Sequence, residues 1–208
     1  MDSLHLPTAR VVTAEPPRAI VKKAILLAAG VGDRLQPFTQ EFPKCLVPVN
    51  GVPIIVNALT HLSAVGVTEA VIVVGHHKEK LYERFGDTFE DMKITYIESK
   101  DFASTNNIYS LWLARDHLDE DVFLLEADVF FESALLEKML EHESGSLAAV
   151  SQHQPWMSGA VVSLSKSGNI QALMDAREQG PDFDYSKVYK TVNIYLFQKE
   201  FLRRYFLP

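Results

Sequence analysis

A glycine-rich segment between residues 27 and 44 combines the residue types that bind phosphate. Gly30 and Gly32 follow the apolar run 24–29, and glycine lets a backbone approach a ligand closely and adopt positive φ angles. Backbone N–H groups exposed in such a turn bind anions. Arg34 adds a planar guanidinium that pairs with phosphate oxygens, and Lys44 adds a compact positive charge. The segment therefore predicts a phosphate-binding loop.

Two common phosphate motifs do not describe this loop. A P-loop ends in Gly-Lys-Ser/Thr, which the segment lacks. The dinucleotide fingerprint needs a third small residue where this chain has Leu35.

A carboxylate motif, Glu126-Ala127-Asp128, follows the apolar run 122–125. A carboxylate at the carboxyl end of a parallel strand points into the crevice where α/β sheets bind ligands. Mg²⁺ takes one or two carboxylates together with substrate phosphates. Asp128 is therefore a candidate Mg²⁺ ligand; the alternative is that Asp128 caps the helix expected after it.

Amide and hydroxyl side chains open the apolar helical segment 108–117. Asn106 and Asn107 offer donors and acceptors to a base or a ribose. Ser110 lies near the helix N-terminus, where N–H groups favour anions. The alternative is that Thr105 and Asn106 only cap the helix.

Hydrophobic periodicity places these residues on alternating strands and helices. Strands are expected at 24–29, 70–74, 93–97 and 122–125, and helices at 53–65, 79–85, 108–117 and 133–140. Strands at 147–150, 159–164 and 192–197 lack helices between them, which indicates an antiparallel extension. The expected fold is a Rossmann-like three-layer α/β/α arrangement with a mostly parallel mixed sheet.

The domain organisation is expected to be simple. Residues 1–21 contain three prolines and no periodicity, which predicts an N-terminal lead-in before one domain at 22–208. The sequence stops inside an apolar segment at Pro208. We therefore expect the domain to be truncated, with a missing or fused C-terminal segment.

Composition excludes several classes of function. A net charge of -7 argues against binding to nucleic acid, which needs a basic face. The single cysteine, Cys45, allows no internal disulfide and fits a reducing compartment. No apolar run approaches the roughly 20 residues of a membrane-spanning helix, and the N-terminus lacks a signal-peptide pattern. We expect a cytoplasmic protein that binds neither nucleic acid nor membranes.

The phosphate loop closely resembles the start of the sugar-phosphate nucleotidyltransferase superfamily. The string carrying the resemblance is Leu27-Ala28-Ala29-Gly30-Val31-Gly32-Asp33-Arg34-Leu35-Gln36-Pro37-Phe38-Thr39, followed by Pro43-Lys44. In that family the loop wraps the triphosphate of an NTP and uses Mg²⁺. The resemblance implies catalytic roles for Arg34 and Lys44 and Mg²⁺ binding by Asp128. It implies nucleotide contacts from Leu27, Ala28, Ala29, Gly30 and Gly32. Separately, Gly75 ends the second apolar run, and we expect it to allow close approach of the base.

A second metal-binding aspartate, usual far downstream in that family, has no convincing match. Asp182 and Asp184 lie in the loop sequence Gly-Pro-Asp-Phe-Asp-Tyr, which is typical of solvated residues. His76 and His77 follow Gly75, but a zinc site would need a third ligand that is not evident.

The segment from Asn106 to Ala114 resembles the phosphocholine cytidylyltransferase branch and the related enzymes that activate phosphonates such as 2-aminoethylphosphonate with CTP. Sugar-1-phosphate members typically carry Gly-Thr-Ala there. An ammonium-bearing acceptor favours aromatic faces, which makes Trp156 a candidate. The resemblance implies that Lys190 reaches the acceptor phosphate, and Asn193 lies in the same segment.

These observations predict Mg²⁺-dependent transfer of a nucleoside monophosphate from an NTP, with CTP favoured, to a small phosphorylated or phosphonylated acceptor. A sugar-1-phosphate nucleotidyltransferase and a non-catalytic domain of the same fold remain as alternatives.

Overall fold

A mixed sheet of nine strands forms the centre of the computed structural model, which describes residues 20–142 and 145–207 apart from the side chain of Arg34. Eight strands follow the order β10-β9-β11-β7-β1-β4-β6-β5, and β8 pairs with β11. The strands β1 (Lys23–Ala28), β4 (Glu69–Val74), β6 (Met92–Glu98) and β7 (Val122–Glu126) run parallel. Ala24, Ile25 and Leu26 have no exposed surface, because helices cover both faces of β1.

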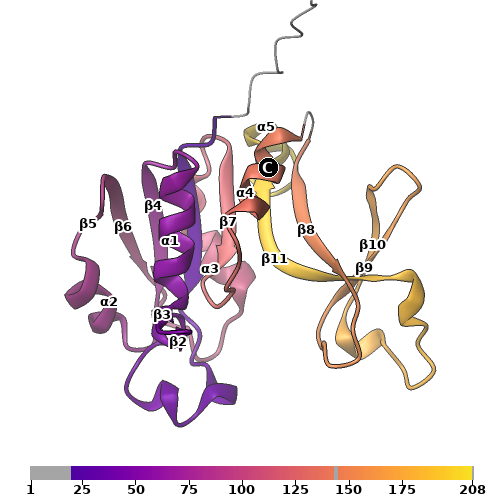
Figure 1. Cartoon of the computed structure of the whole chain (residues 1–208), viewed down its shortest axis with the longest axis horizontal. Coiled ribbons are helices and arrows are strands. Elements are labelled where there is room, and N and C mark those ends of the chain that lie inside the picture. Colours follow the sequence, from indigo (N-terminus) through magenta and orange to yellow (C-terminus); the bar gives the residue numbers. More distant parts are fainter. Residues whose placement is uncertain (1–19, 143–144, 208) are drawn as a thin grey trace, which may run out of the picture.

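Helices cover the two faces of this sheet (Figure 1). The helices α1 (Ile54–Ala64), α2 (Lys78–Phe85) and α4 (Ala134–Glu141) pack on one face through Leu59, Leu81, Leu136 and their neighbours. The helices α3 (Asn107–Leu113) and α5 (Lys199–Tyr205) pack on the other face through Leu111 and Leu202. The expected three-layer α/β/α architecture and mostly parallel mixed sheet are confirmed.

The order of the parallel strands creates a binding crevice. From β1 the chain passes to the neighbouring β4 and then to β6, but from β6 it crosses back to β7 on the far side of β1. Connections therefore leave β1 and β7 in opposite directions. Such a switch point opens a crevice at the carboxyl ends of the two strands, where α/β proteins bind ligands.

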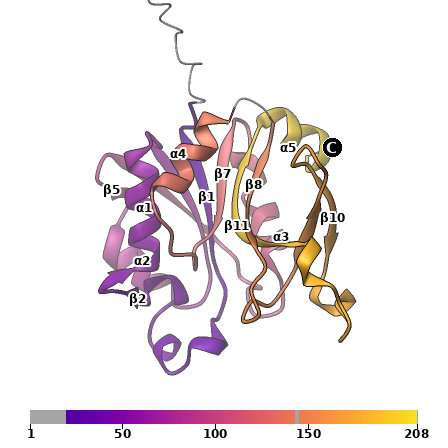
Figure 2. The same cartoon turned by 45° about the vertical axis from the view of Figure 1, so that its right-hand side comes forward.

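The strands after residue 145 are antiparallel, as expected. They are β8 (Leu147–Gln152), β9 (Val161–Leu164), β10 (Ile170–Met174) and β11 (Tyr189–Phe197). One half of β11 pairs with β7, and the strand continues beyond the end of β7 to pair with β9. Figures 1 and 2 show β9 and β10 projecting from the helix-covered part, and we call residues 159–190 the wing.

Several elements were not expected. The helix predicted at 108–117 ends at Leu113 and is followed by a 3₁₀ turn at Arg115–His117. The strands β2 (Pro48–Val49), β3 (Val52–Pro53) and β5 (Thr88–Phe89) are two residues long. In β10, four of five residues are exposed, so hydrophobic patterning gave no signal for it. The predicted lead-in falls almost entirely on residues 1–19, outside the described part. Among the described residues, no helix has the length and apolar character needed to cross a membrane.

Candidate active site

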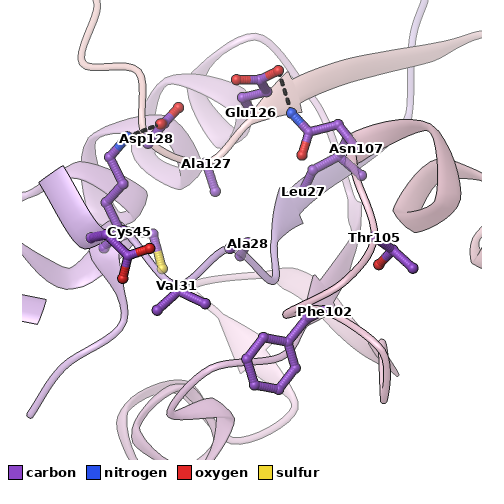
Figure 3. Close-up of a pocket in the computed structure, with 14 residues that line it drawn as sticks. Leu27, Ala28, Val31, Cys45, Phe102, Thr105, Asn107, Glu126, Ala127 and Asp128 are labelled. Carbon is purple, nitrogen blue, oxygen red and sulfur yellow. Dashed lines mark hydrogen bonds and ion pairs between the residues drawn. The ribbon is translucent and has the colours of Figure 1, made fainter. Parts of the chain in front are cut away.

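A pocket of about 440 Å³ lies at the carboxyl ends of β1 and β7 (Figure 3). It is lined by the glycine-rich loop, the segment before α3 and the end of β7. The lining residues are Leu27, Ala28, Gly30, Val31, Gly32, Asp33, Lys44, Cys45, Phe102, Thr105, Asn107, Glu126, Ala127 and Asp128. The switch point of the sheet thus brings together predicted site residues that are far apart in the sequence.

The glycine-rich loop folds back on itself in three 3₁₀ turns, at Asp33–Leu35, Phe38–Gln40 and Lys44–Leu46. Gly32 has φ 76°, and the Thr39 hydroxyl donates to the Gly32 carbonyl at 3.0 Å. A Cβ at Gly32 would lie 3.0 Å from the Cβ of Lys44. Gly32 is therefore needed both for its backbone conformation and for the close approach of Lys44. Arg34 lies in the first turn, but its side chain is outside the described part.

Lys44 and Asp128 form an ion pair inside the pocket, in which the ammonium group donates to Oδ2 of the carboxylate. Both side chains are partly exposed, at 26% and 29%. The N-cap of α4 is Ser133, so the alternative role of Asp128 as a helix cap is wrong. The Asp128 carboxylate instead faces the pocket together with Lys44.

Glu126 also lines the pocket, a position for which the sequence predicts no role. Its Oε1 accepts a hydrogen bond from the Asn107 amide at 2.5 Å, and its Oε2 accepts one from the Asn193 amide at 2.9 Å. Burial raises the pKa of Glu126, and the nearby Asp128 adds to this increase, while both amides oppose it. The only sequence signal for this residue was its place at the end of a buried strand.

The predicted nucleotide-binding residues divide into two groups. Leu27, Ala28, Gly30, Gly32 and Asn107 line the pocket. Ala29, Gly75, Asn106 and Ser110 are not among its lining residues. Asn106 is the N-cap of α3 and accepts from the Tyr109 N–H at 3.3 Å, as the capping alternative proposed, and Ser110 is buried in the helix.

Gly75 acts on the pocket through a neighbour. A Cβ at Gly75 would lie 2.7 Å from the Ala29 carbonyl oxygen and 2.8 Å from Phe102. Phe102 lines the pocket opposite the strand ends (Figure 3). The absence of a side chain at Gly75 therefore lets Phe102 pack closely against the β4 end.

The histidine pair contacts the glycine-rich loop. Nε2 of His76 lies 3.3 Å from the Thr39 carbonyl oxygen, and Nε2 of His77 lies 2.9 Å from that of Gln40. In the part of the chain that the structure describes, no three His, Cys, Asp or Glu side chains are grouped to hold a metal. The two imidazoles thus connect the end of β4 to the second turn of the glycine-rich loop.

The predicted acceptor residues lie toward the wing, outside the pocket lining. Lys190 donates to the Thr191 carbonyl at 3.1 Å, and burial lowers the pKa of its ammonium group while Glu126 opposes this shift. Trp156 lies in the turn after β8 and is 78% exposed. Asn193 contacts Glu126, which makes it the member of this group joined directly to the pocket.

The Asp128 carboxylate fits a magnesium ion whose other ligands would be phosphate and water oxygens. Asp128 offers one carboxylate to the pocket, and Mg²⁺ characteristically combines one or two carboxylates with phosphates and water. Asp184 is engaged locally, since it accepts from the Ser186 N–H and hydroxyl, and the Ser186 and Lys187 contacts lower the pKa of Asp184 to about 2. The exposed Asp182 lies in the same loop.

Comparison with known proteins relates the chain to nucleotidyltransferases. The chain is 43% identical to the CMP-5'-(3-aminopropyl)phosphonate synthase of Streptomyces rubellomurinus over 94% of its own length and 31% of that protein. It is 29% identical to a UTP–glucose-1-phosphate uridylyltransferase of Haloferax volcanii over 76% of this chain and 67% of that protein. The structure of the CTP:phosphocholine cytidylyltransferase of Streptococcus pneumoniae superposes with a TM-score of 0.64 and 25% identity, over 86% of this chain and 72% of that one.

The family assignment rests on a match across most of the chain. Residues 24–185 match the MobA-like NTP transferase domain, and this range contains the glycine-rich loop, Lys44 and the β7 carboxylates. The sequence resemblance to nucleotidyltransferases is thereby confirmed. This chain belongs to the MobA-like NTP transferase domain family, a family of nucleotidyltransferases.

Proposed function

We propose that this chain transfers CMP from CTP to a small amine-bearing phosphonate or phosphate, with release of pyrophosphate. The relative that is 43% identical across 94% of the chain makes a CMP-phosphonate. The phosphocholine cytidylyltransferase fold supports the same class of acceptor. Because the chain spans only 31% of the aminopropylphosphonate synthase, this proposal concerns the nucleotidyl transfer step alone.

The observation that carries the proposal is the Lys44–Asp128 pair in a pocket at the switch point of the sheet. A triphosphate lying along the loop 30–44 would meet the loop N–H groups and the Lys44 ammonium. Its negative charge would otherwise be repelled by a chain of net charge -7. Local placement of cationic and N–H groups therefore supports a phosphate site in an acidic protein.

The proposed reaction is in-line attack by an acceptor oxygen on the α-phosphorus of the NTP. A new oxygen–phosphorus bond forms while the bond from the α-phosphorus to the bridging oxygen breaks, and pyrophosphate takes the electron pair. The phosphonate or phosphate oxygen is already anionic, so no general base is needed. Catalysis then consists of positioning and charge stabilisation, by Lys44, the loop N–H groups and Arg34.

Asp128 is the residue we propose for magnesium. Mg²⁺ bound there would supply charge neutralisation at the phosphates. The proposed acceptor residues lie toward the wing. They are Lys190 and Asn193 on β11, which offer a cation and an amide, and the exposed Trp156, which offers an aromatic face. The single cysteine supports a reducing location, for which we propose the cytoplasm.

A sugar 1-phosphate is the second candidate acceptor, because the uridylyltransferase relative matches 76% of the chain. A screen of four NTPs against phosphocholine, 2-aminoethylphosphonate, 3-aminopropylphosphonate and glucose 1-phosphate, read as pyrophosphate release with Mg²⁺ and with EDTA, separates the candidates. We expect turnover with CTP and an aminophosphonate or phosphocholine that EDTA stops. Turnover only with glucose 1-phosphate would support a sugar-1-phosphate nucleotidyltransferase. No turnover with any pair of substrates would support a non-catalytic domain.

A further inference from the structure

We infer that Glu126 is a positioning residue that joins the nucleotide side of the site to its acceptor side. Each oxygen of its carboxylate accepts a hydrogen bond from a different asparagine, Asn107 on one side and Asn193 on the other. We call these three side chains the carboxylate bridge. The inference rests on the proposed function, because the two sides are named by the molecules that they would bind.

The first contact of the bridge fixes the start of α3. Asn107 is the first residue of α3 and lines the pocket with Phe102 and Thr105, which lie in the segment just before the helix. Its amide is exposed to solvent apart from the bond to Glu126. Without that bond, an exposed asparagine at this position would adopt several rotamers. Glu126 therefore determines where the Asn107 amide is presented.

The second contact fixes an irregular point in β11. Asn193 has φ 62°, a left-handed conformation that is uncommon for residues other than glycine. The pairing of β11 with β8 shifts register between Thr191 and Tyr195, around this residue. Irregularities of this kind redirect a side chain near an active site. Here the amide of Asn193 is directed toward the end of β7.

The orientation of the Asn193 amide is determined by its two neighbours. The Tyr195 hydroxyl donates to Oδ1 at 3.4 Å, and Nδ2 donates to Glu126 at 2.9 Å. The carbonyl and amino ends of the side chain are thus both engaged. A carboxylate that accepts two amide N–H groups is well matched to them, since charge-assisted hydrogen bonds are stronger than neutral ones.

The bridge lies where β11 leaves the main sheet. Pairing with β7 begins at Ile194, and the residues before Asn193 pair instead with β8 and β9. Lys190 pairs with Val161 of the wing, three residues before Asn193. The direction of β11 at Asn193 therefore sets the position of Lys190 relative to the pocket. Glu126 acts on the acceptor side through this strand.

Four variants separate the side-chain contacts from the backbone conformation. Asn193→Gly keeps the positive φ and removes the amide, while Asn193→Ala removes the amide and strains the backbone. Asn107→Ala removes the other donor. Glu126→Ala removes both acceptor oxygens at once. Glu137→Ala, the same substitution at an exposed residue of α4, is the control.

Steady-state kinetics, with the NTP and acceptor that the wild type uses, should distinguish the effect of the Asn107 contact from that of the Asn193 contact. We expect Asn193→Gly to raise KM for the acceptor about tenfold, and Asn107→Ala to raise KM for the NTP similarly, as each loses one charge-assisted hydrogen bond. Glu126→Ala should raise both KM values, and adding Asn193→Gly to it should change acceptor KM by less than threefold. Simple additivity of the two substitutions, or unchanged KM values with only a lower Tm, would overturn the inference.

Hydrogen exchange tests the bridge independently of catalysis. In Glu126→Ala, amide exchange should increase in both residues 104–109 and residues 188–193, and Glu137→Ala should leave both segments unchanged. Unchanged exchange in both segments rejects the bridge even if the enzyme is active. Faster exchange in a protein that transfers no nucleotide supports the bridge and rejects the proposed function instead.

Discussion

Lys44 and Asp128 are 84 residues apart in the sequence, yet their side chains form an ion pair within one pocket. Lys44 comes from the third turn of the glycine-rich loop, and Asp128 comes from the residues just after β7. Each would lose its partner when a ligand binds, because phosphate competes for the ammonium and a cation competes for the carboxylate. Under the proposed function, the pair would keep two opposite charges compensated until phosphate and a cation replace their mutual contact.

This arrangement predicts that both charges are needed for turnover and neither is needed for folding. Lys44→Ala and Asp128→Asn should each lower kcat by about 10² or more, the usual effect of removing one group that stabilises transition-state charge. The pair is partly exposed, so breaking it should cost no more than about 1 kcal/mol of stability. Pyrophosphate release and thermal unfolding measure the two effects.

Lys80→Ala is the matched control for these variants, because Lys80 pairs with Glu83 on the exposed surface of α2. It should change neither turnover nor unfolding. Near-normal turnover in both Lys44→Ala and Asp128→Asn would falsify the assignment of this pocket as the catalytic site.

Gly75→Ala should disturb the pocket without touching a ligand. The added Cβ would meet the Ala29 backbone oxygen at 2.7 Å and Phe102 at 2.8 Å, so Phe102 has to move. We expect a loss of about 1–3 kcal/mol from overpacking, about 2–4 °C in Tm for each kcal/mol, and a higher KM for the NTP. Gly180→Ala is the control, since nothing lies within 4 Å of its Cβ position. Equal Tm values for the two variants would contradict the packing argument.

The pocket was predictable from the sequence because the strands that position it produce local hydrophobic patterns. The apolar runs that become β1 and β7 are recognisable as buried parallel strands, and the order of elements places Gly30, Lys44 and Asp128 at their carboxyl ends. The family resemblance then predicts triphosphate binding by the loop, a catalytic role for Lys44 and Mg²⁺ binding by Asp128.

The carboxylate bridge was not predictable, because it depends on long-range register. Asn106 and Asn107 are adjacent and chemically identical, and only the start of α3 decides that Asn106 caps the helix while Asn107 faces Glu126. Asn193 reaches Glu126 because β11 changes register against β8, which no periodicity reports. The exposed strand β10 was missed for a related reason, as it buries too little to show alternation.

Cys45 should be unreactive in the folded protein. Its side chain is 2% exposed, and burial raises the pKa of its thiol to about 12, so almost no thiolate is present at pH 8. We expect alkylation to be at least about 100-fold slower in the native chain than in urea, with one label per chain because Cys45 is the single cysteine. Rapid native labelling would instead mean that the loop carrying Lys44 opens readily.

Lys23 should make stability depend on two acidic partners. This lysine is buried at the start of β1, and its ammonium lies 2.8 Å from Asp119 and 2.9 Å from Glu120. Replacing both partners by amides leaves a buried cation without a counter-charge, which should cost about 1–3 kcal/mol at pH 7. Adding Lys23→Met should recover most of this loss, because an apolar side chain of similar length needs no partner. Urea unfolding of the double and triple variants measures both changes.

The dependence of the unfolding free energy on acidic pH tests the same contact through Asp119. Desolvation of Lys23 favours its neutral form, but Asp119 and Glu120 outweigh this effect and raise the pKa of Lys23. The hydrogen bond from Lys23 in turn lowers the pKa of Asp119. A carboxyl whose folded pKa lies below its unfolded value of about 3.9 stabilises the fold above that pH, and the contribution is lost as pH falls through the lowered pKa. The difference in unfolding free energy between wild type and Asp119→Asn should therefore be constant from pH 7 to about 5 and shrink below about pH 4. A difference that stays constant down to pH 2.5 would show that Asp119 acts through packing and not through its charge.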